Sequence, residues 1–247
     1  MLDGGLLGNV GSRETGTCQS RRRRQRRLCA LGRGDRRTRV RENGCRRVEA
    51  IVEGRIALPS PSYRGTRTLE EAMVKRRSNR SFLDRPIELA AVGQLLWAGQ
   101  GIRDRSGGRT APSAGGRYPV DLFIATEEGV GQYLPEEHEI EGIRSEDLRE
   151  LLYSAALFQD SIKQAPLIVV ITADFDRAEH QHGEDRAERF AWIEVGHVAQ
   201  NILLQAYAMG LAGVGFGAFK DEQVVEVMQL PPESAPLYII AIGYSRS

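Results

Sequence analysis

The chain has 247 residues, a mass of 27.4 kDa and 41% hydrophobic residues, which is enough to bury the core of one globular domain. No uncharged apolar run reaches the roughly 18 residues of a membrane span, so we expect no transmembrane helix. The N-terminus lacks the basic-then-apolar pattern of a secretory signal, which predicts a cytoplasmic protein.

The net charge of +1 conceals an uneven distribution. Residues 1–50 carry 14 arginines, no lysine and five acidic residues, a net charge of +9, whereas residues 51–247 carry −8. All three cysteines, Cys18, Cys29 and Cys45, lie in the basic segment. Residues 51–247 therefore have neither a catalytic thiol nor a disulfide framework.

Residues 1–50 have no helical or strand period, and their clustered arginines repel one another. Such a segment buries too little apolar surface to offset its ordering entropy, so we predict that it is disordered. Clustered arginines could serve as a nucleic-acid-binding tail, because they release counterions from phosphates. The absence of lysine, and the presence of cysteines in a solvated segment, favour an adventitious extension instead. We therefore expect no nucleic-acid partner and one domain over residues 51–247.

After an irregular, proline-containing lead-in, Thr68 and Glu71 form a capping box that opens a first helix. That helix ends in a basic cluster, Arg76-Arg77-Ser78-Asn79-Arg80. A second helix is predicted from about Leu89 to Ala98. Its core residues would be Leu95, Leu96 and Trp97, and Gly99 and Gly101 would end it.

Residues 103–117 form a polar, glycine-rich loop that is too long for a simple connector and is therefore a candidate site. A strand over 120–126, a hairpin around Tyr133 and a short helix from Ser145 follow. The apolar, β-branched run 167–173 predicts a central strand buried on both faces.

A long helix is expected over 184–209, ending at Gly210. Apolar residues lie nearly all round it between Trp192 and Tyr207, which is typical of a helix buried within a protein or a dimer. A strand over 213–219, a helix over 221–228 and a strand over 237–243 complete a layered α+β fold.

Several common catalytic motifs are absent, including a P-loop, a nucleophile elbow and spaced Cys/His ligands. Gly213, Gly215 and Gly217 lack the third glycine position of a dinucleotide-binding fingerprint. Glu194-x-x-His197 matches half of a di-iron pattern but lacks a second copy, so we interpret it as a buried Glu–His pair. His180 and His182 could bind a metal, but solvated loop histidines are commoner, and we expect no metal catalysis.

Three segments are candidates for a binding site. The arginines of 76–80 suit a phosphate monoester, although a solvated charge run would look the same. In the loop 109–119, two prolines stiffen a backbone of small residues that a flat ligand can approach closely. The glycines of 210–219 would let a strand edge present its N–H groups to a ring system, or would simply make a tight turn.

Taken together and in order, the motifs resemble the nitroreductase-like FMN-dependent oxidoreductase superfamily. The resemblance covers roughly residues 55–247 and rests on five motifs: R-R-S-x-R, P-S-A-G-G-x-Y-P, E-x-G-H-x-x-Q-N, G-V-G-F-G-A-F and P-L-Y-I-I-A-I-G. The second motif resembles that of the SagB-type azoline dehydrogenase branch, which also includes stand-alone members.

The resemblance implies a mainly antiparallel sheet flanked by helices, a long helix at a homodimer interface, and FMN bound between the subunits. It further implies a ping-pong mechanism through flavin N5, from NAD(P)H to a small acceptor such as a nitro compound or quinone. The protein would supply position and electrostatics rather than catalytic side chains. The implied FMN-binding residues are Arg76, Arg77, Ser78, Arg80, Pro112, Ser113, Ala114, Gly115, Gly215, Phe216, Gly217 and Arg246, with the proline–serine loop coming from the opposite subunit.

The sequence departs from its relatives at two places. The Lys-Tyr pair of azoline dehydrogenases is replaced by the stretch from His180 to Arg186, and the loop asparagine of many nitroreductases by Gly116. An azoline-type dehydrogenase of a modified-peptide pathway and a flavin-binding protein without turnover remain as alternatives.

Overall fold

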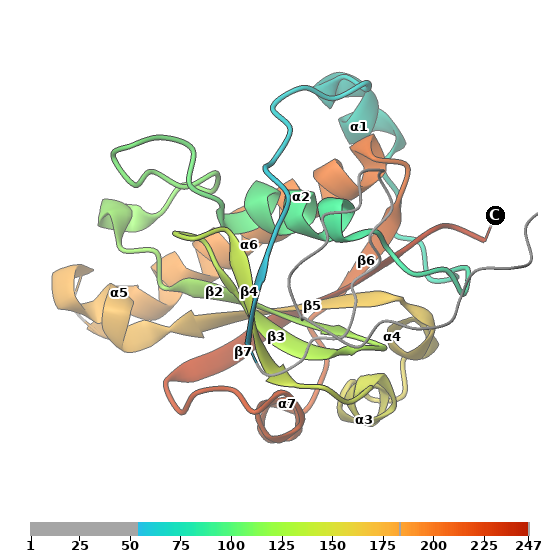
Figure 1. Cartoon of the computed structure of the whole chain (residues 1–247). Coiled ribbons are helices and arrows are strands. Elements are labelled where there is room, and N and C mark those ends of the chain that lie inside the picture. Colours follow the sequence, from blue (N-terminus) through green and yellow to red (C-terminus); the bar gives the residue numbers. More distant parts are fainter. Residues whose placement is uncertain (1–53, 183, 247) are drawn as a thin grey trace, which may run out of the picture. The chain divides into compact units, whose positions relative to one another are not determined.

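The computed structural model describes residues 54–182 and 184–246, and this part of the chain forms one antiparallel seven-stranded sheet flanked by helices (Figure 1). The strand order is β1-β4-β3-β2-β5-β7-β6. The strands are β1 (Gly54–Ala57), β2 (Val120–Thr126), β3 (Gly129–Leu134), β4 (Glu139–Arg144), β5 (Leu167–Asp174), β6 (Ala212–Phe216) and β7 (Ser234–Gly243). The predictions for residues 1–50, and the domain boundary at residue 51, lie outside the described residues.

Seven α-helices and one 3-10 turn are described. They are α1 (Leu69–Lys75), α2 (Leu89–Gln100), η1 (Ala114–Gly116), α3 (Arg149–Ala155), α4 (Asp160–Gln164), α5 (Phe175–His182), α6 (Glu184–Ala208) and α7 (Asp221–Met228). Strands and helices thus agree with the predicted α+β class. Within the described residues, no helix is long and apolar enough to cross a membrane.

One half of the capping box predicted at the first helix is present, since the Thr68 hydroxyl accepts the Glu71 N–H at 3.1 Å. The Glu71 carboxylate instead accepts from Lys75 Nζ and the Tyr207 hydroxyl. The predicted end of α2 is wrong by two residues, because the helix continues through Gly99 and is capped at Gly101. A Cβ at Gly99 would lie 3.0 Å from the Ile202 Cδ1 atom of α6. Gly99 therefore allows close helix packing rather than ending the helix. Trp97, which was predicted to be a core residue, is only half-buried.

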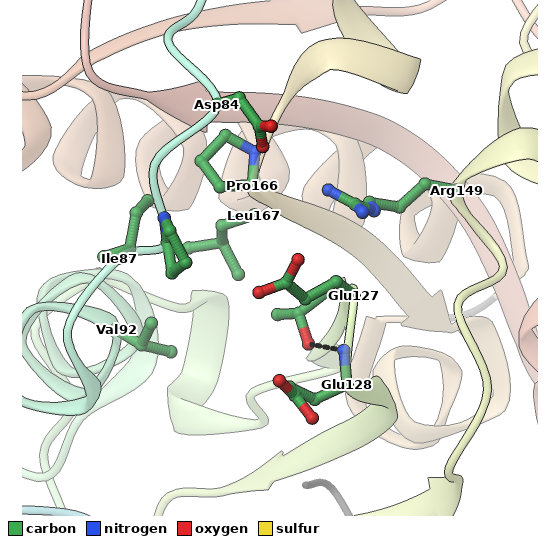
Figure 2. A pocket seen from close by; sticks show the side chains of 10 residues that line it. Asp84, Ile87, Val92, Glu127, Glu128, Arg149, Pro166 and Leu167 are labelled. Atoms are coloured by element: carbon green, nitrogen blue, oxygen red, sulfur yellow. Dashed lines mark hydrogen bonds between the residues drawn. The ribbon is translucent and has the colours of Figure 1, made fainter. Parts of the chain in front are cut away.

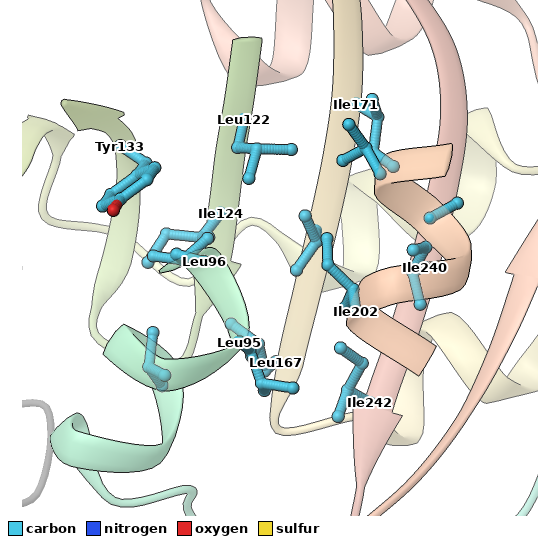
Figure 3. Close-up of a cluster of buried hydrophobic side chains, with 14 of the residues drawn as sticks. Leu95, Leu96, Leu122, Ile124, Tyr133, Leu167, Ile171, Ile202, Ile240 and Ile242 are labelled. Atoms are coloured by element: carbon cyan, nitrogen blue, oxygen red, sulfur yellow. The ribbon is translucent and has the colours of Figure 1, made fainter. Parts of the chain in front are cut away.

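Strand β5 is the central strand that its apolar sequence predicted. It pairs antiparallel with β2 on one side and β7 on the other, and Leu167 to Ala173 are all buried. Successive residues face opposite sides of the sheet. Leu122 and Ile124 of β2 face a core beneath α2 and α6 (Figure 3), whereas Phe123 and Ala125 face a second core beneath α3, α4 and α7.

The long helix α6 lies across the sheet, and one side of it is buried, as Val198, Ile202 and Ala206 indicate. Its opposite side is also apolar in part, because Trp192 is 47% exposed and Ile193 is 49% exposed. The exposed side also carries the polar side chains of His197 and Gln200, so in this chain only one side of the helix is buried. The further prediction, that a second subunit covers the exposed side, stays a prediction.

Candidate functional site

The basic cluster that follows α1 lies along the outer edge of β6. Ser78 forms a parallel bridge with Gly213, and the Asn79 N–H donates to the Gly213 carbonyl at 3.2 Å. The C-terminal residues join the same arrangement, since the Arg246 N–H donates to the Ser81 carbonyl at 3.2 Å. Two predicted segments and Arg246, which are far apart in sequence, are thus brought together.

The guanidinium groups of this cluster have no acidic partner among the described residues. Arg76 is half-buried and Arg80 and Arg246 are exposed, and none of the three forms an ion pair there. Arg77 differs, because its guanidinium donates to the carbonyls of Val74 and Arg76. The exposed Ser78 adds a hydroxyl beside the arginines. Unpaired arginines beside a hydroxyl are suited to bind an anion such as a phosphate.

Strand β6 is the last strand of the sheet, and its outer edge is open beyond Gly213. The Gly213 carbonyl points away from β7, toward Asn79. Because strand geometry repeats every second residue, the N–H and C=O of Gly215 face the same open edge. Phe216, in contrast, directs its backbone toward β7 and buries its side chain in the second core.

Close packing explains two of the glycines in this strand. A Cβ at Gly213 would lie 2.9 Å from Leu203 Cδ2, and one at Gly215 would lie 2.3 Å from the Tyr238 hydroxyl oxygen. A Cβ at Gly217 would come no nearer than 4.0 Å to the Tyr238 ring. The ring against Gly215 is therefore the protein's own tyrosine, and Gly217 is the glycine with open space beside it.

The turn between α3 and α4 borders the other end of the open edge, and no sequence motif indicates it. The Gln159 side chain donates to the Ala218 carbonyl at 3.1 Å, and the Ser161 hydroxyl donates to the Arg80 carbonyl at 3.1 Å. In this turn Leu157 and Phe158 both have left-handed backbones, with φ of 56° and 59°, and Phe158 is 66% exposed. An exposed aromatic side chain on a strained turn is therefore held beside the candidate site.

The proline–serine loop lies on other elements, between α2 and β2. Thr110 anchors its start, because the Thr110 hydroxyl donates to the Trp97 carbonyl at 2.9 Å. Pro112 and Gly115 are exposed, while Ser113 and Ala114 are half-buried. No hydrogen bond or ion pair described for the chain joins these four residues to the arginine cluster. In the sheet, β5 and β7 lie between β2, which the loop enters, and β6, which the arginine cluster borders, so one chain presents the predicted residues as two separate groups.

The Glu-x-x-His motif does not form the buried pair that the sequence suggested. Glu194 is 2% exposed and accepts a hydrogen bond from Gln100 Nε2 at 3.0 Å, whereas His197 lies on the exposed side of α6. Burial raises the pKa of the Glu194 carboxyl, and hydrogen bonds from Ser113, Gln100 and the Val120 amide oppose that shift. The side chains of His180 and His182 lie outside the described residues.

Two cavities are lined by other residues. A groove of about 830 Å³ lies between residues 60–69, α2 and the C-terminal half of α6. A smaller cavity of about 20 Å³ lies where Asp84, Glu127 and Arg149 approach Ile87 and Leu167 (Figure 2), with room for about one water molecule. None of the predicted binding residues lines either cavity.

Comparison with known proteins gives a consistent result. The model of the nitroreductase family matches residues 73–244. A nitroreductase-like protein of Methanocaldococcus jannaschii is 38% identical over 181 residues, which are 71% of this chain and 90% of that protein. The described fold is also similar to solved structures.

The crystal structure of a nitroreductase-like protein from Ralstonia eutropha JMP134 has a TM-score of 0.73 and 32% identity, and covers 84% of this chain and 97% of that one. The NADPH:FMN oxidoreductase of Vibrio harveyi, solved with NAD+, has a TM-score of 0.55 and 24% identity, and the match covers 72% of this chain and 69% of that chain. At 24% identity, the similarity to the Vibrio harveyi structure concerns the fold alone.

Proposed function

The chain belongs to the nitroreductase family, and from that premise we propose that it is an FMN-dependent oxidoreductase that works as a homodimer. It transfers hydride or electrons from NAD(P)H to a small acceptor such as a nitro compound or a quinone. Family membership supports a flavin oxidoreductase in general, and the finer assignment rests on the site.

The unpaired arginine cluster beside the open edge of β6 is the observation that carries the proposal. A phosphate monoester fits there, because Arg76, Arg80 and Arg246 offer charged donors and Ser78 offers a hydroxyl. A flavin ring fits beside them, because the backbone of Gly215 faces the open edge and Gly217 leaves space next to it. The residues present are thus compatible with FMN.

When bound, FMN supplies the hydride transfer chemistry, and the protein binds and orients the reactants. The arginines would hold the phosphate end, and the backbone N–H groups at Gly215 and Gly217 would offer hydrogen bonds to negative charge on the ring. Phe216 supports these positions by packing into the core beneath β6. No acid–base pair of side chains is needed.

The separation of the predicted residues into two groups supports a homodimeric site. Pro112, Ser113, Ala114 and Gly115 would contact the flavin bound on the partner's β6 edge. The exposed side of α6, with Trp192 and Ile193, supports the same assembly, because a second copy would remove these side chains from water.

The loop motif supports a place in the SagB-type branch as a stand-alone member. The departure between His180 and Arg186 from the Lys-Tyr pair of azoline dehydrogenases supports a small-molecule acceptor over a peptide azoline. A flavin-binding protein without turnover is the alternative of another class. It would bind FMN but show no NAD(P)H-dependent flavin reduction.

The test begins with the absorbance spectrum of the purified protein and chromatography of the released cofactor, with about one FMN per subunit expected. FMN affinity is then compared in Arg76→Ala, Arg80→Ala and the control Arg55→Ala, whose arginine lies on β1 and pairs with Glu141 of β4. Loss of one charge-assisted contact worth about 1.5–3 kcal/mol weakens binding about 10- to 150-fold. Equal affinity in all three variants and the wild type would refute the phosphate site, and a protein that binds no FMN would refute the function.

A further inference from the structure

Glu194 is a buried carboxylate that the proposed function has not used. It lies on α6, and Gln100 Nε2 at the end of α2 donates to it at 3.0 Å. Burial raises the pKa of its carboxyl, and hydrogen bonding from Ser113, Gln100 and the backbone at Val120 opposes that shift. A charged group so well hydrogen-bonded can stay buried, and it also fixes the groups that donate to it.

The same network continues to the start of the proline–serine loop. The Gln100 side-chain oxygen accepts from Arg109 Nη1 at 3.2 Å, and Arg109 Nη2 pairs with Glu136 at 3.2 Å. The Arg109 guanidinium lies 4.7 Å from the centre of the Tyr118 ring, and the Arg109 backbone N–H donates to the Tyr118 hydroxyl at 3.1 Å. The two ends of the loop are thereby held together.

Ser113 connects Glu194 to the far end of the loop. Its hydroxyl accepts the Tyr118 N–H at 2.8 Å, and hydrogen bonding from Ser113 lowers the pKa of the Glu194 carboxyl. Between them Gly115 and Gly116 have φ of 61° and 65°, and Tyr118 itself has φ of 50°. A left-handed backbone at a bulky residue such as tyrosine is held only where the surrounding contacts fix it.

We infer that Glu194 is a positioning residue that, through Gln100, Arg109 and Ser113, holds the loop Pro112–Gly115 in the shape that contacts the flavin of the partner subunit. The inference rests on the proposed function and adds a residue to it. The placement supports it, since Pro112 and Gly115 are exposed for contact while Ser113 is half-buried and its hydroxyl accepts the Tyr118 N–H.

The experiment compares Glu194→Gln, Ser113→Ala and the double variant with the wild type. Glu188→Gln is the control, because it makes the same chemical change at an exposed position of α6, where the Glu188 carboxylate accepts from Trp192 Nε1 at 3.3 Å. Three readouts are used. They are the FMN dissociation constant, the visible circular dichroism of bound FMN, and hydrogen exchange of the backbone amides in residues 109–119 without FMN.

We expect Glu194→Gln to weaken FMN binding about tenfold and to speed exchange in the loop about tenfold, the size of change that follows the loss of a hydrogen bond to a charged group. The visible circular dichroism should change, because the ring contacts change. Ser113→Ala should give similar effects, and the double variant should add little to either, since both act through one contact. Glu188→Gln should match the wild type.

The inference is overturned if the wild type binds FMN while Glu194→Gln retains wild-type affinity and loop exchange, and in that case the proposed function stands. It is also overturned if the effects of the two single variants simply add. Should Glu194→Gln fail to fold, Ser113→Ala decides by hydrogen exchange of residues 109–119 without FMN: faster exchange supports the inference, and wild-type exchange overturns it. A wild type that binds no FMN refutes the proposed function and this inference together.

Discussion

The substitution Gly215→Ala should destabilise the fold through Tyr238, whether or not a cofactor is bound. A Cβ at residue 215 would lie 2.3 Å from the Tyr238 hydroxyl oxygen, 2.5 Å from Cζ and 2.7 Å from Cε1. All three distances are shorter than real Cβ contacts, so the tyrosine ring must move. Tyr238 packs partly against the core beneath α6, and moving it disturbs that packing.

Inserting a methyl group into a packed site costs about 1–3 kcal/mol. For a protein of this size, each 1 kcal/mol lowers the melting temperature by about 2–4 °C, so the expected loss is about 2–12 °C. Gly217→Ala is the matched control on the same segment, because its Cβ would come no nearer than 4.0 Å to Tyr238. We expect that variant to retain the stability of the wild type.

The assay is thermal and urea unfolding of the FMN-free proteins, followed by circular dichroism. A second comparison places Gly215→Ala in a Tyr238→Leu background, where the clash is removed and the added cost of alanine should fall below about 0.5 kcal/mol. The reasoning is refuted if Gly215→Ala and Gly217→Ala have equal stability, or if Tyr238→Leu leaves the cost of alanine unchanged.

Three further substitutions test other parts of the fold. Thr68→Ala should cost about 1 kcal/mol in chemical denaturation, because the Glu71 N–H at the start of α1 loses its cap; unchanged stability would contradict the role of that hydrogen bond. Gln229→Gly should raise stability by about 0.5–1 kcal/mol, since residue 229 ends α7 with a left-handed φ of 50°; a destabilised variant would contradict this. Burial lowers the pKa of His138 from its ordinary 6.5, and its ring contacts the Tyr133 hydroxyl and the Pro59 carbonyl. Protonation therefore favours the unfolded chain, so stability present above pH 6.5 should be lost as the pH falls through the lowered pKa. The His138→Gln variant lacks this titration. If its free energy of unfolding depends on pH in the same way as that of the wild type, the role given to His138 is refuted.

Elements with a strong local signal were predicted well from the sequence. The bounds of β2 and α7 agree with the prediction, and so does the start of α1, because hydrophobic period and capping are local properties. β1, α4 and α5 were missed. β1 has four residues and is a strand only because it pairs with β4, about 85 positions later, while α4 has five residues and too few turns to show a period.

The candidate site shows the same contrast between local sequence signals and contacts that form only in the tertiary structure. The sequence alone determined the fold class, the family resemblance and the identity of the residues that could bind FMN, because these depend on motifs and periodicity. Only the tertiary structure placed Arg80 and Arg246 beside the β6 edge, put Tyr238 against Gly215, and separated Glu194 from His197. These contacts join segments that are distant in sequence, and burial depends on what the rest of the chain packs against each residue.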